Sequence, residues 1–177
     1  MEPLVLRPNP EPYNFIDKWR DPLWKRCGVY LWSIEHRDGY LASYAGQCFG
    51  GSTNFEIRIG QEFKWWKSGK DRPVDIDQWK RGVRVELPMP PPPGHTAREI
   101  VELKPLIRLW LIPLATQVEC NQAERWLVAE LCKHPMTRQF LSNQKPESGR
   151  YRPDLTWPVR IDAPSSFQIF GLTAPIT

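Results

Sequence analysis

Apolar and polar side chains alternate over residues 28–36, and a period of two residues predicts a β-strand. One face of this segment holds three large side chains, Tyr30, Trp32 and Ile34. The dipeptide Asp38-Gly39 follows, and both residue types accept the positive φ angles of a tight turn. Because residues 40–47 alternate again, we predict a β-hairpin whose two strands lie side by side.

Further segments have the apolar spacing of regular structure. Over residues 54–67, apolar side chains recur every three or four positions, which predicts an amphipathic helix capped by Thr53 or Asn54. These side chains are Phe55, Ile59, Phe63 and Trp66. Residues 121–133 predict a second helix, whereas the almost unbroken apolar run at 106–114 predicts a strand covered on both faces.

Proline divides the rest of the chain, because each ring removes a backbone donor and fixes φ. Five prolines in residues 1–22 predict an extended N-terminal arm, and we expect the fold to begin after it. Residues 70–104 are interpreted as a Pro-rich insertion loop, with a candidate short strand at 83–87 and a polyproline spacer at 88–93. Residues 146–177 are expected to form an irregular C-terminal extension that packs back on the domain.

The predicted order of elements is strand, tight turn, strand, helix, insertion, strand and helix. This order indicates an α+β domain over residues 23–145, with a small three-stranded antiparallel sheet and flanking helices. The chain of 177 residues has the length of one domain with a tail, and its 41% apolar residues, with nine Trp, suffice for a core.

Composition and charge exclude some classes of protein. No apolar stretch is long enough to span a bilayer, and the N-terminus lacks the basic and apolar blocks of a signal peptide, so we expect a cytoplasmic protein without membrane contact. The net charge of +4 permits a polyanionic partner without requiring one. The four cysteines show no C-x-x-C spacing and are predicted to be free thiols.

The predicted hairpin contains two tripeptides with thirteen residues between their tyrosines, Gly28-Val29-Tyr30 and Tyr44-Ala45-Gly46. In this order, and followed by two helices, they resemble the GIY-YIG nuclease family, whose name records these tripeptides on adjacent strands. The family places an arginine on the following helix and a metal-binding glutamate on a later one, and Arg58 and Glu124 stand in those places. Asn143 resembles the asparagine that follows the family's glutamate.

The resemblance implies a metal-dependent endonuclease that hydrolyses phosphodiester bonds of DNA, with RNA as the alternative substrate. Glu124 is then expected to hold one Mg²⁺ or Mn²⁺ and Arg58 to steady the phosphate. One tyrosine, Tyr44 rather than Tyr30, is expected to help deprotonate the attacking water. A single site cuts one strand at a time, so double-strand cleavage implies a homodimer or sequential visits.

Helical geometry gives an argument for Glu124 that does not depend on the family. Its carboxylate falls in the middle of the apolar stripe of the second predicted helix. That stripe consists of Leu127, Val128 and Leu131. A buried carboxylate needs a cation, a hydrogen-bond donor or a proton, so a divalent metal would satisfy it. The alternative is a buried salt bridge to Arg58 or Arg108.

The other candidate residues also have simpler interpretations. Arg58 would pair with Glu62 one helical turn later, and the two tyrosines would be half-buried packing residues. Glu62 stands where many family members have histidine, and it would repel phosphate unless it pairs with Arg58 or binds metal. Gln47 stands where a lysine often follows the second tripeptide. Gly28 and Gly46 are expected to allow close backbone approach.

Cations and aromatic side chains alternate over residues 63–72, a composition that suits a phosphate backbone and stacked bases. The candidate contacts are Lys64, Trp65, Lys67 and Lys70. The alternative is that Phe63 and Trp66 belong to the core and the lysines are solvated. His36, His95 and His134 are interpreted as surface residues, the alternative being that His36 or His95 approaches the site as a base.

Two functions compete with the nuclease. The first is a nuclease-like module that has lost turnover and holds nucleic acid or a protein partner, which the substitution at Glu62 favours. The second is an interaction protein whose Pro88–Pro93 segment binds an aromatic-lined groove.

Overall fold

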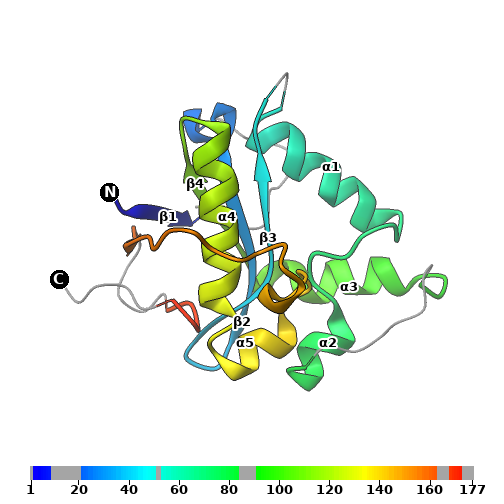
Figure 1. Ribbon diagram of the computed structural model, residues 1–177. Helices are drawn as coiled ribbons and strands as arrows, with labels where there is room; N and C mark the ends of the chain where they lie inside the picture. The colour runs from blue at the N-terminus through cyan, green and yellow to red at the C-terminus, as the bar shows by residue number, and fades with distance from the viewer. Residues whose placement is uncertain (1, 9–20, 51–52, 84–90, 163–167, 173–177) are drawn as a thin grey trace.

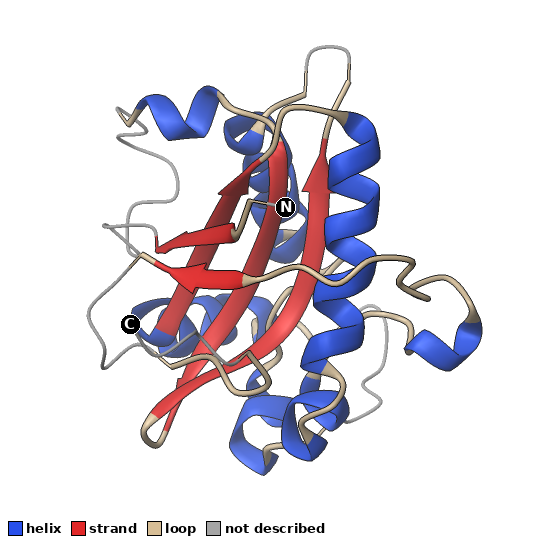
Figure 2. Ribbon diagram, turned by 60° about the vertical axis from the view of Figure 1, so that its left-hand side comes forward, coloured by secondary structure: helices blue, strands red, loops and turns tan. Residues whose placement is uncertain are grey.

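The computed structural model describes residues 2–8, 21–50, 53–83, 91–162 and 168–172. Within these ranges the fold is α+β, as predicted, but the sheet has five strands and is mixed rather than three-stranded and antiparallel (Figures 1 and 2). The strands, in order across the sheet, are β3 (Gly39–Cys48), β2 (Gly28–His36), β4 (Ile107–Pro113), β1 (Leu4–Pro8) and β5 (Val159–Ile161). The predicted antiparallel strands are therefore the β3-β2-β4 part of a larger sheet.

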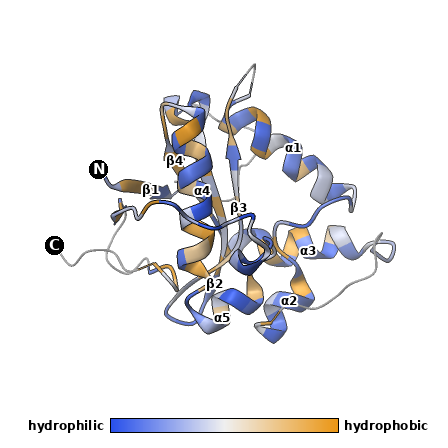
Figure 3. Ribbon diagram, viewed as in Figure 1, coloured by the Kyte–Doolittle hydropathy of each residue, from blue (hydrophilic) through white to orange (hydrophobic). Residues whose placement is uncertain are grey.

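The helices pack on both faces of this sheet. They are α1 (Phe55–Lys67), α2 (Ile76–Arg81), α3 (His95–Leu103), α4 (Gln117–Leu131) and α5 (Pro135–Phe140), together with the short 3-10 helices η1 (Pro22–Lys25), η2 (Lys104–Leu106) and η3 (Pro146–Ser148). Hydrophobic and hydrophilic residues follow each other along α1 and α4, as the hydropathy colouring shows (Figure 3). No helix in the described ranges combines the length and apolar character that a bilayer span requires.

The β2-β3 hairpin forms as predicted, but its turn lies one residue earlier. His36 pairs with Gly39, so Arg37 and Asp38 make the turn, and the positive φ of 53° falls on Arg37. Glycine is required at position 39 for a different reason. A Cβ atom there would lie 2.7 Å from the carbonyl oxygen of Gln168, a contact that only glycine avoids.

The expectation that the fold begins after residue 22 is wrong. β1 pairs antiparallel with β4 and parallel with β5. Leu4 and Leu6 are buried in the same apolar cluster as the side chains of α4. The prolines at positions 3 and 8 lie at the ends of this strand, where they do not interrupt the pairing of its interior. Residues from the chain's two ends thus complete one core.

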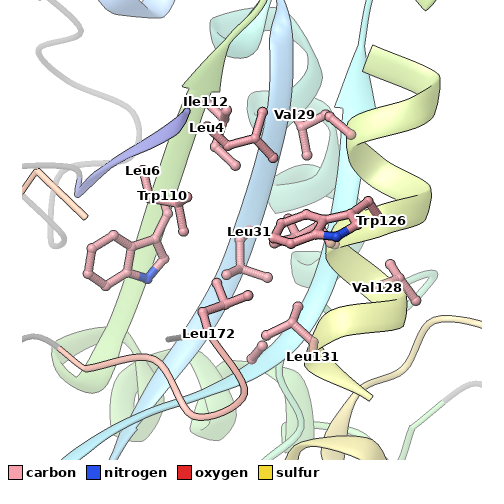
Figure 4. Close-up of a cluster of buried hydrophobic side chains, with 14 of the residues drawn as sticks. Leu4, Leu6, Val29, Leu31, Trp110, Ile112, Trp126, Val128, Leu131 and Leu172 are labelled. Carbon is pink, nitrogen blue, oxygen red and sulfur yellow. The ribbon is translucent and has the colours of Figure 1, made fainter. Parts of the chain in front are cut away.

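Two apolar clusters lie on opposite faces of the central strands. On one face, the predicted apolar stripe of α1 packs against Tyr30, Trp32 and Ile34 of β2. On the other, α4 packs against Val29 and Leu31 of β2 and against side chains of β1 and β4 (Figure 4). Because alternate residues of a strand point to opposite faces, β2 contributes to both clusters and is buried throughout most of its length.

Capping residues fix where the two main helices begin. The side chain of Asn54 accepts a hydrogen bond from the backbone N–H of Ile57 and caps α1, one of the two predicted caps. Thr116 and Glu119 form a capping box at the start of α4. This box explains why α4 begins at Gln117, before the predicted residue 121.

The insertion at 70–104 is not a loop, because it contains α2 and α3. Asp75 caps α2 by accepting from the N–H of Gln78, and α3 buries Leu103 against the core. His95, expected at the surface, opens α3 instead and lies 3.0 Å from the buried carboxylate of Glu99. The candidate strand at 83–87 falls almost entirely outside the described residues, and so does much of the proline spacer.

The outer edge of β3 is covered by the segment that follows α5. Ser142 N–H donates to the Ser43 carbonyl at 2.8 Å. The Asn143 side chain accepts from Ala45 N–H and donates to the Ala45 carbonyl, both at 2.8 Å. These contacts satisfy backbone groups that an edge strand would otherwise expose. The four cysteines are free thiols, as predicted.

Candidate active site

Tyr30 and Tyr44 lie on the same face of the β2-β3 hairpin. Tyr30 is opposite Gly46 and Tyr44 is opposite Trp32, and cross-strand partners share a face. The two phenol rings are 6.3 Å apart between centroids and tilted by 51°. Gly46 makes room for this arrangement, since a Cβ atom there would lie 2.4 Å from the Tyr30 hydroxyl.

Glu62 lies beneath these tyrosines as a buried carboxylate with 1% of its surface exposed. Its Oε1 accepts from the Tyr30 hydroxyl at 2.5 Å, and its Oε2 accepts from Trp32 Nε1 at 2.8 Å. Position 62 therefore does not present a negative charge to solvent. It orients Tyr30 by accepting a hydrogen bond from the Tyr30 hydroxyl.

Arg58 is held by the same carboxylate from one helical turn away. Its Nη2 lies 3.3 Å from Glu62 Oε1, and its Nε donates to the Tyr30 hydroxyl at 3.0 Å. The simpler interpretation, an Arg58–Glu62 pair, is thus present, but the acid is buried while the guanidinium is 27% exposed. Within the described part of the chain, no group bonds Arg58 Nη1.

Trp65 supports Arg58 from the side. The Arg58 guanidinium carbon lies 5.4 Å from the centroid of the Trp65 ring, a cation–π contact. The structure thus gives Trp65, expected to stack on bases, a partner within the protein. Lys64, Lys67 and Lys70 are exposed beside it.

Glu124 is positioned by a hydrogen-bonded bridge between β3 and α4. Its Oε2 accepts from Gln47 Nε2 at 2.9 Å, and the same nitrogen donates to Asn121 Oδ1 at 2.7 Å. Asn121 precedes Glu124 by three residues, so both side chains lie on one face of the helix. Neither Arg58 nor Arg108 forms an ion pair with Glu124 in the part of the chain that is described.

These groups meet because β3 is the edge strand of the sheet. Arg58 comes from the face covered by α1 and Glu124 from the face covered by α4, and Tyr44 interacts electrostatically with both. Tyr30 and Glu62 form a buried floor, whereas Tyr44, Arg58 and Glu124 are partly exposed. The site therefore has a buried, hydrogen-bonded floor, and the three groups above it are accessible to solvent.

Burial governs the protonation of the site. It raises the pKa of Tyr30 well above 10, helped by the adjacent Glu62, and raises the pKa of Tyr44 to about 12. Both phenols are consequently neutral at pH 7. Burial also raises the pKa of Glu124, while Arg150, Gln47 and Arg58 oppose that rise.

The oxygen atoms around Gln47 are the candidate ligands for a divalent ion. Mg²⁺ prefers oxygen ligands and is often held by one or two carboxylates together with waters and substrate phosphates. Glu124 Oε2 and Asn121 Oδ1 both accept from the Gln47 amide nitrogen, so a metal ion would use the other carboxylate oxygen, Glu124 Oε1. No three His, Cys, Asp or Glu residues in the described ranges gather into a cage for a metal. A single carboxylate oxygen would suit only an ion that keeps most of its waters or binds substrate oxygens.

Asn143 does not join this donor set. It is 4% exposed and uses both side-chain atoms to hold the backbone of Ala45. Its contribution to the site is indirect, through the position of the neighbouring Tyr44. Gly28 likewise acts through the backbone, because a Cβ atom there would lie 2.0 Å from the Ile112 carbonyl oxygen.

Sequence reasoning missed Asn121, Arg150 and Tyr151. The spacing of Asn121 from Glu124 was available as a signal, since residues three apart share a helix face. Arg150 and Tyr151 gave no local signal, because they reach the site through the packing of a later segment.

Comparisons with family models, curated proteins and solved structures give no match for this chain. The assignment of function depends on the arrangement of these side chains.

Proposed function

We propose that this chain is a metal-dependent endonuclease of the GIY-YIG type that hydrolyses phosphodiester bonds of DNA. One observation carries the proposal: Tyr30, Tyr44, Arg58 and Glu124, the residues that the resemblance selects, gather around the edge strand β3. They come from two strands and two helices on opposite faces of the sheet. A phosphodiesterase needs such a combination of cation, carboxylate and hydroxyl groups at one solvent-facing point.

Arg58 is the phosphate-binding group in this proposal. Tyr30 and Glu62 hold its Nε and Nη2. Nη1 is left to donate to a phosphate oxygen, and the fixed guanidinium stabilises the additional negative charge of the pentacovalent transition state. Glu62 thus supports Arg58 from below instead of repelling the substrate.

Glu124 and Tyr44 act on the attacking water. Glu124, whose Oε2 is oriented by the Gln47 amide that Asn121 also binds, would hold the metal ion with its other carboxylate oxygen. Mg²⁺ or Mn²⁺ supplies Lewis-acid activation of water and phosphate when bound. Tyr44 is neutral at pH 7, and its hydroxyl orients the water by hydrogen bonding. Tyr30 is not the base, because its hydroxyl keeps its proton and donates a hydrogen bond to the buried Glu62.

Plasmid nicking tests the proposal. With Mg²⁺, the protein is expected to convert supercoiled DNA to the nicked form, and EDTA or the substitution Glu124→Gln is expected to reduce the rate at least a hundredfold or so. Glu130→Gln is the matched control on the same helix, since Glu130 pairs with Lys133 at the surface and not with the site. Nicking that survives in Glu124→Gln would exclude this mechanism.

A second candidate is a DNA-binding module without turnover. It is favoured by the charge of Arg58 being paired with Glu62 and by the raised pKa of Tyr44, both of which reduce reactivity. This candidate predicts salt-sensitive DNA binding with no nicking under any divalent ion. Direct conversion of supercoiled to linear DNA would indicate a homodimer, because a single site cuts one strand at a time.

A further inference from the structure

The segment that follows α5 crosses the molecule close to the site. After the edge contacts of Ser142 and Asn143, the chain runs through η3 and passes across α4 toward β5 (Figures 1 and 2). Residues 142–151 of this segment are called the strap. The strap is part of the fold, because Tyr151 is buried to 4% exposure in the same apolar cluster as α4.

A chain of contacts fixes the strap against Tyr44. The Tyr151 hydroxyl accepts from Asn143 Nδ2 at 3.2 Å, and Asn143 in turn brackets the backbone of Ala45. Ala45 directly follows Tyr44 in β3. The buried Tyr151 ring is therefore anchored beside the strand that carries the site.

Arg150 lies at the surface on this anchor. Its guanidinium carbon is 5.2 Å from the Tyr151 ring centroid, so the ring restricts where the charge can lie. In the described ranges no acid forms an ion pair with Arg150, whereas Arg125 and Arg138 each have an acidic partner. A positive charge is thus held on the strap, beside the strand that carries Tyr44.

We propose that Arg150 is a second phosphate-binding residue of this site, which contacts the nucleic-acid backbone on the α4 side of β3 as Arg58 does on the α1 side. The two guanidinium groups come from segments on either side of the edge strand. Each rests on an aromatic ring, Trp65 for Arg58 and Tyr151 for Arg150. This inference rests on the proposed function in one respect, which is that the ligand is a nucleic acid with a negatively charged backbone.

Binding of a short fluorescein-labelled DNA duplex, followed by anisotropy in EDTA over a range of salt concentrations, tests this inference. Arg150→Gln should weaken binding about tenfold and lower the magnitude of the log–log salt slope by about 1, because one phosphate contact is lost. Arg150→Lys should retain the slope with reduced affinity, since lysine keeps the charge but loses the planar stacking. Arg152→Gln is the matched control, because Arg152 is exposed on the same segment.

The outcomes separate this inference from the proposed function. If Arg150→Gln behaves like Arg152→Gln, or if the unmodified protein does not bind the duplex, the inference is overturned. If binding depends on Arg150 but no divalent ion supports nicking, Arg150 stands as a phosphate-binding residue and the endonuclease proposal fails. Nicking that is intact in Arg150→Gln, with an unchanged salt slope, removes the inference and leaves the endonuclease.

Discussion

Replacing Glu62 by glutamine should destabilise the protein strongly despite the similar size of the two side chains. The two carboxylate oxygens accept from Tyr30 and Trp32 and face Arg58. A glutamine offers one acceptor oxygen, so its NH₂ group would face one of the donors. Because Trp32 is 0% exposed, water cannot replace the acceptor that its N–H loses.

The expected loss follows from these contacts. A buried donor without an acceptor costs about 1–3 kcal/mol, and loss of the partly exposed charge pair adds up to about 1 kcal/mol. Removing a buried charge offsets part of this, so we expect a net loss of about 1–3 kcal/mol in the free energy of unfolding. For a chain of 177 residues, that loss lowers Tm by about 2–12 °C.

Urea unfolding followed by tryptophan fluorescence measures this loss. Glu56→Gln is the control on the same helix, where the exposed pair with Lys25 should contribute less than about 1 kcal/mol. The double variant Glu62→Gln/Trp32→Phe should lose less than the sum of its single variants, since the unpaired donor is removed as well. If Glu62→Gln costs no more than Glu56→Gln, the buried floor of the site is not held as described.

Two further predictions concern stability. Gly46→Ala should destabilise the fold by about 1–3 kcal/mol, because the new Cβ would lie 2.4 Å from the Tyr30 hydroxyl. Thermal unfolding measures this loss, and an unchanged Tm would contradict the close packing of Tyr30 on Gly46. Burial raises the pKa of Glu62, Glu99 and Glu124 above the ordinary value of 4.5, so the folded chain retains protons that the unfolded chain releases, and stability should fall as pH rises above that value. The lowered pKa of His36 has the opposite effect on stability, but it is one group against three. A urea midpoint that rises steadily from pH 4.5 upward would contradict the raised pKa values of the three glutamates.

Local periodicity was sufficient for the elements that surround the site. The two-residue alternation located β2 and β3, and the spacing of apolar residues located α1 and α4, because each pattern follows from the geometry of a single backbone segment. The same geometry put Arg58 and Glu62 on one side of α1. The starting residue of α4 and the helices of the insertion were missed, since capping and short helices depend on polar residues that the apolar pattern ignores.

The resemblance selected four side chains, but the sequence held no information about how they would meet. Their meeting depends on β3 lying at the edge of the sheet, so that side chains from opposite faces reach the same place. The hydrogen bond from Gln47 to Glu124 and the contact of Arg150 with Tyr151 likewise join segments that are distant along the chain.

The sequence by itself determined the strands β2, β3 and β4, the helices α1 and α4 and the apolar faces of these elements, because those properties arise within a few consecutive residues. The tertiary structure decided the added strands β1 and β5, the burial of Glu62 and the position of the strap. Strand order, register and packing are set by the free energy of the whole core, and no local pattern encodes that sum.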